Sequence, residues 1–398
     1  MMKCLILQLY STTFLWRKNK QGLLYNSLDG SCFLFELTRE VNALCLELED
    51  PENFYTVKIE TSLLEQCYVL DLWIKDVCKR KMGCLRDYNS NDFHLSFPPI
   101  VSIKYGNKTE NIMNYLHELV FYISGSRNVN VDYYKQILYP ISSVNKLCIK
   151  QLVLFLQSFK TRCLQSLYFV GIEVLNSEET NFLFSYLSGL NKEVIFVLRT
   201  DDFIKYTKSV NFILVKKNVM KFWIICHSLD EYYSLKSMED VNVKMVYVFL
   251  VRSTEELMKL QLLNNLENND EIILLPIFVG NNISFFEDHI FLSEQDICDM
   301  PITKREVFLH QTLNLYDFGR LVIMPDGTVY ANLNESALGE WTDPLYDIIH
   351  TELMEGNSWL YIRDKEPCLG CVYQWLCPSP SNYERVLQKK ALCFKSNV

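Results

Sequence analysis

The chain has 398 residues, a length that predicts two or three domains. Hydrophobic residues make up 49% and charged residues 22%, which is typical of a globular protein and far from a disordered composition. The formal net charge of -9 argues against a broad nucleic-acid-binding surface, so no nucleic-acid partner is expected.

The apolar segments are too short to cross a membrane. The longest, Val243–Val251 and Ile272–Val279, are strand-sized, whereas a membrane-spanning helix needs roughly 20 residues. The N-terminal residues contain a short apolar run without a small-residue cleavage site, so we interpret them as a strand and not as a signal peptide. The sequence therefore predicts a cytoplasmic protein with no membrane partner.

Cysteine is abundant, with 14 residues, and most are expected to stay reduced in such a protein. The first ten, from Cys4 to Cys298, are scattered singly along apolar patterns. We expect most of these ten to be small buried hydrophobic residues. The other four lie together near the C-terminus.

Residues 1–95 predict a small α+β domain. The expected elements are strands at Thr13–Trp16, Leu23–Asn26 and Cys32–Glu36, then helices at Thr38–Glu49 and Ser62–Met82. Lys20-Gln21-Gly22 is the predicted hairpin turn between the first two strands. The domain is expected to end before Pro98-Pro99.

Residues 96–309 alternate strands with helices. The expected strands are Glu118–Ile123, Leu164–Val170, Val194–Leu198, Asn211–Val215, Lys221–Cys226, Val243–Val251 and Glu271–Phe278. The expected helices are Asn145–Phe159, Ser177–Leu190 and Thr254–Leu266, and the acidic pairs Asp201-Asp202 and Glu255-Glu256 are expected at helix starts. This alternation predicts an α/β fold with a parallel sheet, and the number of strands favours a partial (β/α) barrel over a complete one.

Residues 310–398 change in character. Leu321–Met324 and Val329–Asn332 flank Pro325-Asp326-Gly327, a strong hairpin signal, and Leu345–Glu355 predicts a helix. Cys368, Cys371 and Cys377 then follow in a CX2CX5C spacing, and Cys393 lies farther on. Two thiolates separated by two residues can face one metal centre from a single turn, and Gly370 supplies the bend.

Four thiolates suit an iron–sulfur cluster or a structural zinc ion. The predicted metal ligands are therefore Cys368, Cys371, Cys377 and Cys393. Unrelated thiols and a CX2C redox centre are the alternatives, but redox motifs of that kind open a helix after a strand, whereas Cys368 follows Lys365-Glu366-Pro367 in a loop.

The segment Cys368–Glu384 (CLGCVYQWLCPSPSNYE) resembles the SPASM domain of radical SAM peptide maturases. Ile323–Asn332 (IMPDGTVYAN) and Leu338-Gly-Glu resemble the hairpin of the same domain. Within this group, the chain is most similar to the pseudo-radical-SAM proteins that accompany the GG-type peptide systems of Bacteroidales. The resemblance covers about the last 85 residues well, and implies one 4Fe-4S cluster on the four cysteines.

SPASM domains usually hold a second cluster as well, and its ligands are missing from this chain. Ser381 stands where the family has the fourth cysteine of its run, and Ala331 and Asn332 stand where an early cysteine is expected. The chain thus lacks one ligand set completely and keeps the other complete. This pattern favours one functional cluster site over chance retention of unrelated cysteines.

The motif of a catalytic radical SAM cluster is also missing. No CX3CX2C occurs in the chain, and Ser124–Asp132, the loop after the first expected strand of the barrel, has no cysteine. Val170–Val174 (VGIEV) departs from the Gly-Gly-Glu-Pro motif that contacts S-adenosylmethionine in the family. S-adenosylmethionine is therefore not expected to bind.

Residues 1–95 resemble the small winged-helix-like module by which peptide maturases recognise a leader peptide. Such a module adds the peptide as a strand to a sheet edge beside an apolar helix. The expected function is that of a non-catalytic accessory or scaffold protein, whose partners are a true radical SAM maturase and a precursor peptide. An enzyme of another class that reuses the barrel, and a zinc-stapled peptide-binding protein, remain the alternatives.

Overall fold

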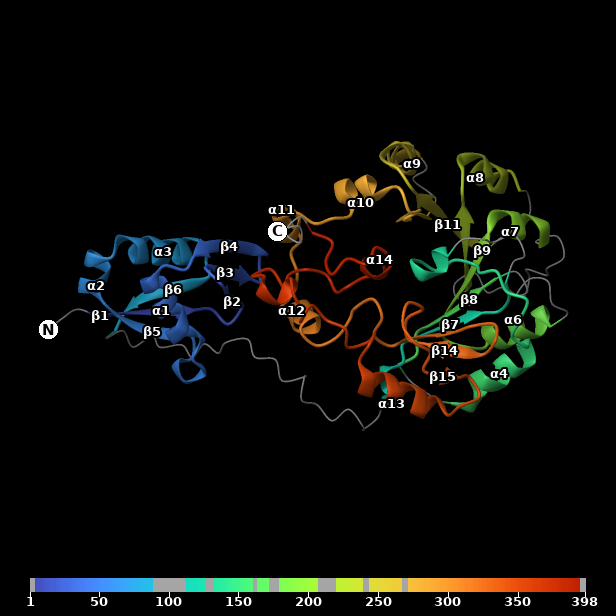
Figure 1. Ribbon diagram of the computed structural model, residues 1–398, viewed down its shortest axis with the longest axis horizontal. Coiled ribbons are helices and arrows are strands. Elements are labelled where there is room, and N and C mark those ends of the chain that lie inside the picture. The colour runs from blue at the N-terminus through green and yellow to red at the C-terminus, as the bar shows by residue number, and fades with distance from the viewer. Residues whose placement is uncertain are drawn as a thin grey trace.

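The structure is a computed structural model that describes residues 4–88, 112–125, 132–159, 163–171, 179–206, 220–238, 243–266 and 271–393. An N-terminal unit lies at one end and a large sheet covered by helices lies at the other, and much of the orange-to-red C-terminal part of the chain lies between them (Figure 1). The predicted strand at Asn211–Val215 and the predicted boundary at Pro98-Pro99 fall outside the described residues.

The N-terminal unit contains two three-stranded antiparallel sheets. In one sheet, β1 (Cys4–Leu9) lies between β5 (Thr56–Glu60) and β6 (Gly83–Asp87); the other consists of β2 (Thr13–Lys18), β3 (Gln21–Asn26) and β4 (Ser31–Glu36). Three helices follow or separate these strands, namely α1 (Arg39–Glu49), α2 (Thr61–Gln66) and α3 (Tyr68–Lys79). The prediction of a small α+β unit is consistent with this arrangement, although β5 and β6 were not expected.

Two local predictions in this unit are wrong. Lys18 pairs with Gln21, so the hairpin turn is Asn19-Lys20, and Asn19 takes the left-handed conformation (φ 54°) that asparagine tolerates well. The helix expected at Ser62–Met82 is two helices, because Cys67 adopts a non-helical conformation (φ -118°, ψ 89°) between them. Of these two helices, only α3 buries apolar residues. The break therefore lets α3 pack against the sheets independently of α2.

The strands of the second N-terminal sheet are apolar on both faces. Leu15 and Leu24 pack into the core formed with α1 and α3, whereas Phe14, Leu23 and Tyr25 belong to another cluster that includes the C-terminal segment. Neighbouring residues of a strand point to opposite faces, so this sheet lies between two cores. It therefore joins the N-terminal unit to the rest of the chain.

The large sheet has nine strands in the order β12-β11-β10-β9-β8-β7-β13-β14-β15. Its first six strands pair in parallel with their neighbours: β7 (Glu118–Tyr122), β8 (Ser166–Val170), β9 (Glu193–Arg199), β10 (Met220–Cys226), β11 (Lys244–Val251) and β12 (Glu271–Pro276). The predicted α/β class with a parallel sheet is therefore confirmed.

Helices follow most of these strands: α4 (Ile149–Ser158), α6 (Thr180–Ser188), α7 (Thr200–Tyr206), α8 (Leu229–Lys236) and α9 (Thr254–Leu266). Their apolar residues share one core with alternate residues of the strands, such as Phe121, Phe169 and Phe196. The opposite face of the strands forms a second core with Tyr139 and Ile141. The predicted acidic pairs lie in the first turns of α7 and α9.

The C-terminal segment begins with three short helices, α10 (Ile283–His289), α11 (Glu294–Asp299) and α12 (Lys304–His310). After them come β13 (Arg320–Ile323), β14 (Thr328–Tyr330), β15 (Gly339–Glu340), α13 (Leu345–Glu355) and α14 (Asn382–Val386). The predicted hairpin is β13–β14, and β13 pairs in parallel with β7. The large sheet therefore continues across residue 310, the expected start of the last domain.

Most of the scattered cysteines are not buried, which corrects the expectation from the sequence. Of the ten, only Cys45 and Cys226 are buried, Cys148 is exposed and the others are half-buried. Cys32 and Cys84 illustrate the reason, since they lie on edge strands with one side open. In the part of the chain that the structure describes, no helix combines the length and apolar character required to cross a membrane.

Candidate metal centre

The four cysteines predicted as ligands line one cavity of about 630 Å³. Distant parts of the chain also contribute to its wall. Asn19 and Gln21 come from the β2–β3 turn, and Ser293 and Glu294 come from the start of α11. The Nδ2 atom of Asn19 donates to the carbonyl of Gly370 at 3.3 Å, so the N-terminal hairpin lies over the CX2C turn.

Local hydrogen bonds bring the cysteines together. Cys368 begins a single 3-10 turn, and the N–H of Cys371 donates to the carbonyl of Cys368 at 3.0 Å. The N–H of Cys377 closes another turn on the carbonyl of Tyr373 at 3.1 Å. Cys393 reaches the cavity through a parallel bridge to Leu292. The expected tight turn at the CX2C pair is thus present, but it is helical instead of an open loop.

The segment between the second and third cysteines is held by apolar contacts. Val372, Tyr373 and Leu376 are buried in a cluster with Phe14 and Leu23 of the N-terminal sheet. The cysteine loop therefore packs on a surface supplied by a distant part of the chain.

One cation lies at the cavity wall. The Nη1 atom of Arg363 lies 3.8 Å from the sulfur of Cys368 and 2.8 Å from Oε1 of Glu384. The side chains of Arg363 and Glu384 are only 10% and 5% exposed. Burial alone would lower the pKa of Arg363, but the carboxylate of Glu384 raises it, so the guanidinium stays charged.

Burial raises the pKa of the Cys377 thiol to about 12, and Arg363 only partly opposes this effect. The pKa of Cys368 is also raised, chiefly by burial and further by Cys393 and Cys371. Without a metal these thiols are therefore protonated at neutral pH. A metal centre would have to displace their protons, and Arg363 would compensate part of the thiolate charge.

The chemistry of the donors fits a thiolate-bound metal centre, because all four cysteines face one space and a buried cation lies beside them. Within the described ranges, no group of three or more histidine, cysteine or acidic side chains is arranged to hold a metal ion as the chain stands. The ligand set Cys368, Cys371, Cys377 and Cys393 thus stays a prediction.

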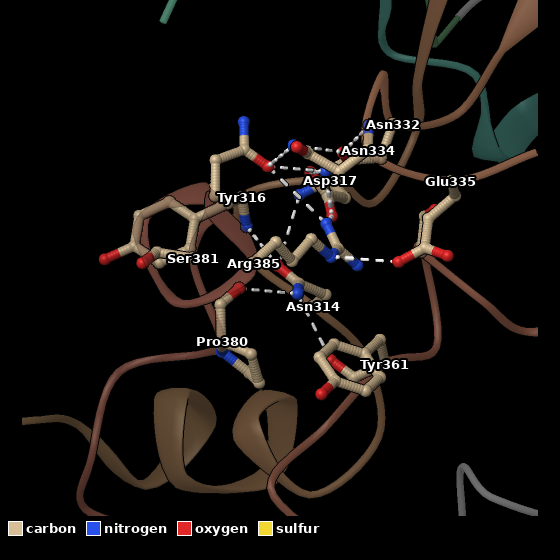
Figure 2. A network of polar contacts seen from close by, with 12 residues as sticks. Asn314, Tyr316, Asp317, Asn332, Asn334, Glu335, Tyr361, Pro380, Ser381 and Arg385 are labelled. Atoms are coloured by element: carbon tan, nitrogen blue, oxygen red, sulfur yellow. Dashed lines mark hydrogen bonds and ion pairs between the residues drawn. The ribbon is translucent and has the colours of Figure 1, made fainter. Parts of the chain in front are cut away.

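The two positions where the resemblance marks lost ligands also come together. Asn332 donates to Oδ1 of Asn382, the neighbour of Ser381, at 2.7 Å, and to both carboxylate oxygens of Asp317 at 3.0 Å. Nη1 of Arg385 lies 2.8 Å from Asp317 (Figure 2). A buried polar network thus occupies the place that the resemblance assigns to a second ligand set.

Ser381 connects this network to the cysteine cavity. It caps the N-terminus of α14, and its N–H donates to Oε2 of Glu384 at 2.6 Å. The other oxygen of Glu384 pairs with Arg363. Sequence reasoning missed both Arg363 and Glu384. The Ser-x-x-Glu pattern signals a capping box and indicates Glu384, but no local pattern indicates Arg363.

Gly171 lies at the place of the altered Gly-Gly-Glu-Pro motif. It has φ +112°, and a Cβ there would come within 2.7 Å of the carbonyl oxygen of Ser124. The segment after β8 passes very close to the segment after β7 at this point. Position 171 therefore requires glycine, independently of any cofactor. Glu173 and most of the loop after β7 lie outside the described residues.

The N-terminal unit offers a strand edge beside a helix. In the described part of the chain β4 pairs only with β3. Trp73 of α3 contacts Phe35 of β4 with ring centroids 5.3 Å apart, and Nη1 of Arg80 donates to the carbonyl of Cys32 at 3.3 Å. Helix α3 thus runs along β4.

No family model matches this sequence, and no curated protein matches it. Solved structures of SuiB from Streptococcus suis are similar over nearly the whole chain. The structure bound to the precursor peptide SuiA has 13% identity, a TM-score of 0.44 and 97% coverage of each chain. The structure bound to S-adenosylmethionine has 13% identity, a TM-score of 0.41 and the same coverage. A third SuiB structure has 13% identity and a TM-score of 0.43, with 96% of this chain and 97% of that chain covered.

Proposed function

We propose that this protein is a non-catalytic accessory or scaffold protein that binds one 4Fe-4S cluster. It would partner a radical SAM maturase in the modification of a ribosomally made peptide. The observation that carries the proposal is the convergence of Cys368, Cys371, Cys377 and Cys393 on one cavity, although the last lies 16 residues beyond the third.

The residues around the cavity favour a structural role for the cluster. All four ligands lie in the last part of the C-terminal segment, where Cys393 bridges to Leu292 near the start of the same segment. The N-terminal hairpin covers them through Asn19. A centre held in this way would cross-link the CX2CX5C turn to the strand-like residues around Cys393. It would also support the surface on which the N-terminal sheet packs. When bound, an iron–sulfur cluster also supplies one-electron chemistry, and the second redox centre would then belong to the partner.

The absence of a CX3CX2C sequence supports a non-catalytic role, because three thiolates at that spacing are what the resemblance requires for cleavage of S-adenosylmethionine. Modification of the precursor peptide would then depend on the partner enzyme. The N-terminal unit would contribute peptide binding at the edge of β4.

Metal and sulfide analysis after anaerobic purification tests the cluster. We expect iron and acid-labile sulfide in about fourfold excess over protein, as a 4Fe-4S cluster requires. Cys377→Ser should lower the iron content because it removes a ligand. The matched control Ser381→Ala should leave it unchanged, because Ser381 lies on the neighbouring network and not on the cavity of the cysteines.

A colourless protein with one zinc ion per chain and no sulfide would favour the zinc-stapled peptide-binding protein instead. Equal iron loss from both variants would contradict the ligand set. The non-catalytic role is tested separately by incubation with S-adenosylmethionine and a strong reductant. Formation of 5′-deoxyadenosine by this protein alone would overturn that part of the proposal.

A further inference from the structure

Three basic side chains lie where neighbouring strands of the large sheet end. Arg199 is the last residue of β9, His227 directly follows β10, and Arg252 directly follows β11. The three strands are parallel and adjacent, so their carboxyl ends meet at one edge. In open parallel sheets this edge is the usual place for a ligand.

The hydrogen bonds of His227 define its protonation. Nη2 of Arg252 lies 3.4 Å from Nδ1 of His227, and a guanidinium can only donate, so Nδ1 is an acceptor. The proton is then on Nε2, which lies 3.2 Å from the hydroxyl oxygen of Tyr139. Burial, the largest effect, lowers the pKa of His227 although Glu231 opposes it, which agrees with a neutral ring.

Several donors lie near one another here, since the charges of Arg199 and Arg252 both act on Tyr139 and His227. Because Nε2 of His227 donates to Tyr139, the hydroxyl of Tyr139 keeps its own proton to donate. Among the described residues, the buried Nε atom of Arg199 has no hydrogen-bond partner, and its Nη2 contacts the exposed carboxylate of Asp201 at 3.3 Å. Leaving a buried charged donor without an acceptor costs about 1–3 kcal/mol or more.

Of the nearby carboxylates, burial raises the pKa of Asp202 against the opposing charge of Arg199. Two others are engaged by the backbone. Oε2 of Glu231 accepts from the N–H of His227 at 2.8 Å, and Oε2 of Glu256 accepts from the N–H of Arg252 at 2.8 Å. The remaining oxygen of Glu256 is 3.8 Å from Nη1 of Arg252, too far for a hydrogen bond. Glu231 and Glu256 thus bind backbone N–H groups just after β10 and β11, and they only partly neutralise the arginine charges.

We propose that Arg199, Arg252 and the hydroxyl of Tyr139 form a binding site for an oxyanion, either a carboxylate or a phosphate group. Two guanidinium groups and a hydroxyl provide the donors that such a group accepts, and arginine matches its planar or tetrahedral oxygens well. His227 orients Tyr139 and Arg252 and is a positioning residue. This proposal does not depend on the metal centre.

Calorimetric titration of the full chain with three probes tests the site. The probes are inorganic phosphate, acetyl-dialanine with a free carboxylate, and acetyl-dialanine amide as the neutral control. We expect at least one anion to bind and the amide not to bind. Arg199→Gln and Arg252→Gln should each weaken anion binding by about tenfold or more. Arg305→Gln, which removes an exposed charge on α12, should leave it unchanged.

Binding of phosphate alone would identify a phosphate-bearing ligand, and binding of the carboxylate alone would identify an organic acid or a peptide terminus. The proposal is wrong if neither anion binds, if the amide binds as well as the carboxylate, or if Arg305→Gln weakens binding as much as the other variants. Arg252 is partly exposed, so its variant stays informative even if Arg199→Gln does not fold.

Discussion

At the scale of single residues, the pair of Arg363 and Glu384 connects the cysteine cavity with the polar network. Both side chains are almost fully buried, and Glu384 additionally receives the N–H of Ser381. Arg363 also donates to the carbonyl of Pro378 at 2.5 Å, directly after the third cysteine. The pair thus fixes the chain directly after Cys377 through charge and hydrogen bonding.

Removing one member of this pair should lower the free energy of unfolding more than removing both. Arg363→Met leaves the carboxylate of Glu384 buried without its cation, which should cost about 3–5 kcal/mol. The double variant Arg363→Met/Glu384→Gln removes both charges and should recover a large part of this loss. The measurement is the urea unfolding of the metal-free chain, with chelator and reductant present.

The control for this comparison is the exposed pair of Lys75 and Asp71 on α3, whose lysine is 69% exposed. Lys75→Met should change the stability by less than about 0.5 kcal/mol. A double variant as unstable as Arg363→Met would show that the geometry of the pair, and not the unpaired charge, is what matters.

At the scale of elements, α3 and the edge of β4 form the surface on which we propose that an extended peptide binds. At 100° per residue, Val69 lies on the same side of α3 as Trp73 and Arg80, which contact β4. Val69 is 48% exposed although it is apolar. A peptide strand added to β4 would cover this side chain, whereas in the described chain nothing pairs with that edge.

We therefore expect Val69→Asp to weaken binding of the precursor peptide, because a charge would be buried beside the added strand. Fluorescence anisotropy with a labelled leader segment measures the effect. Leu46→Asp places the same charge at another exposed apolar position, on α1, and should leave the affinity unchanged. Equal weakening by both substitutions would place the peptide elsewhere on the unit.

At the scale of the whole molecule, one sheet joins two parts of the chain. Figure 1 shows β2, β3 and β4 at the boundary between the N-terminal unit and the C-terminal segment. The hydroxyl of Tyr25 donates to the carbonyl of Ile302 at 2.5 Å and accepts from its N–H at 2.7 Å. Lys304 donates to the carbonyl of Ser11 at 2.8 Å. The second N-terminal sheet is thus tied to the C-terminal segment by hydrogen bonds as well as by apolar packing.

Leu23 and Leu24 provide a matched test, since they are adjacent on β3, fully buried and on opposite faces. Leu23→Ala and Leu24→Ala should both lower the stability by about 2–5 kcal/mol. Only Leu23→Ala removes a contact to the cysteine loop, so only this variant should speed hydrogen exchange at Val372–Leu376. Faster exchange there in both variants would mean that the loop responds to the N-terminal unit as a whole.

The sequence alone determined the class of fold and several elements residue by residue. Helices α9 and α13 begin and end where the periodicity predicts, and the strand-helix alternation predicted the parallel sheet. These features were predictable because they depend on side chains a few residues apart. The four cysteines were recognisable for the same reason, since three of them lie within one short segment.

Only the tertiary structure decided what surrounds those cysteines. Asn19 lies 351 positions from Gly370, which it contacts, and Arg363 meets Glu384 only because the chain turns back after Pro380. The donors at the carboxyl edge of the sheet come from the end of β9, from the residue after β11 and, for Tyr139, from the connection between β7 and α4. No local pattern encodes such contacts, because they depend on strand order and on the packing of whole elements. The sequence therefore predicted the ligands of the candidate metal centre, and the packing of distant elements supplied the wall, the buried cation and the cover.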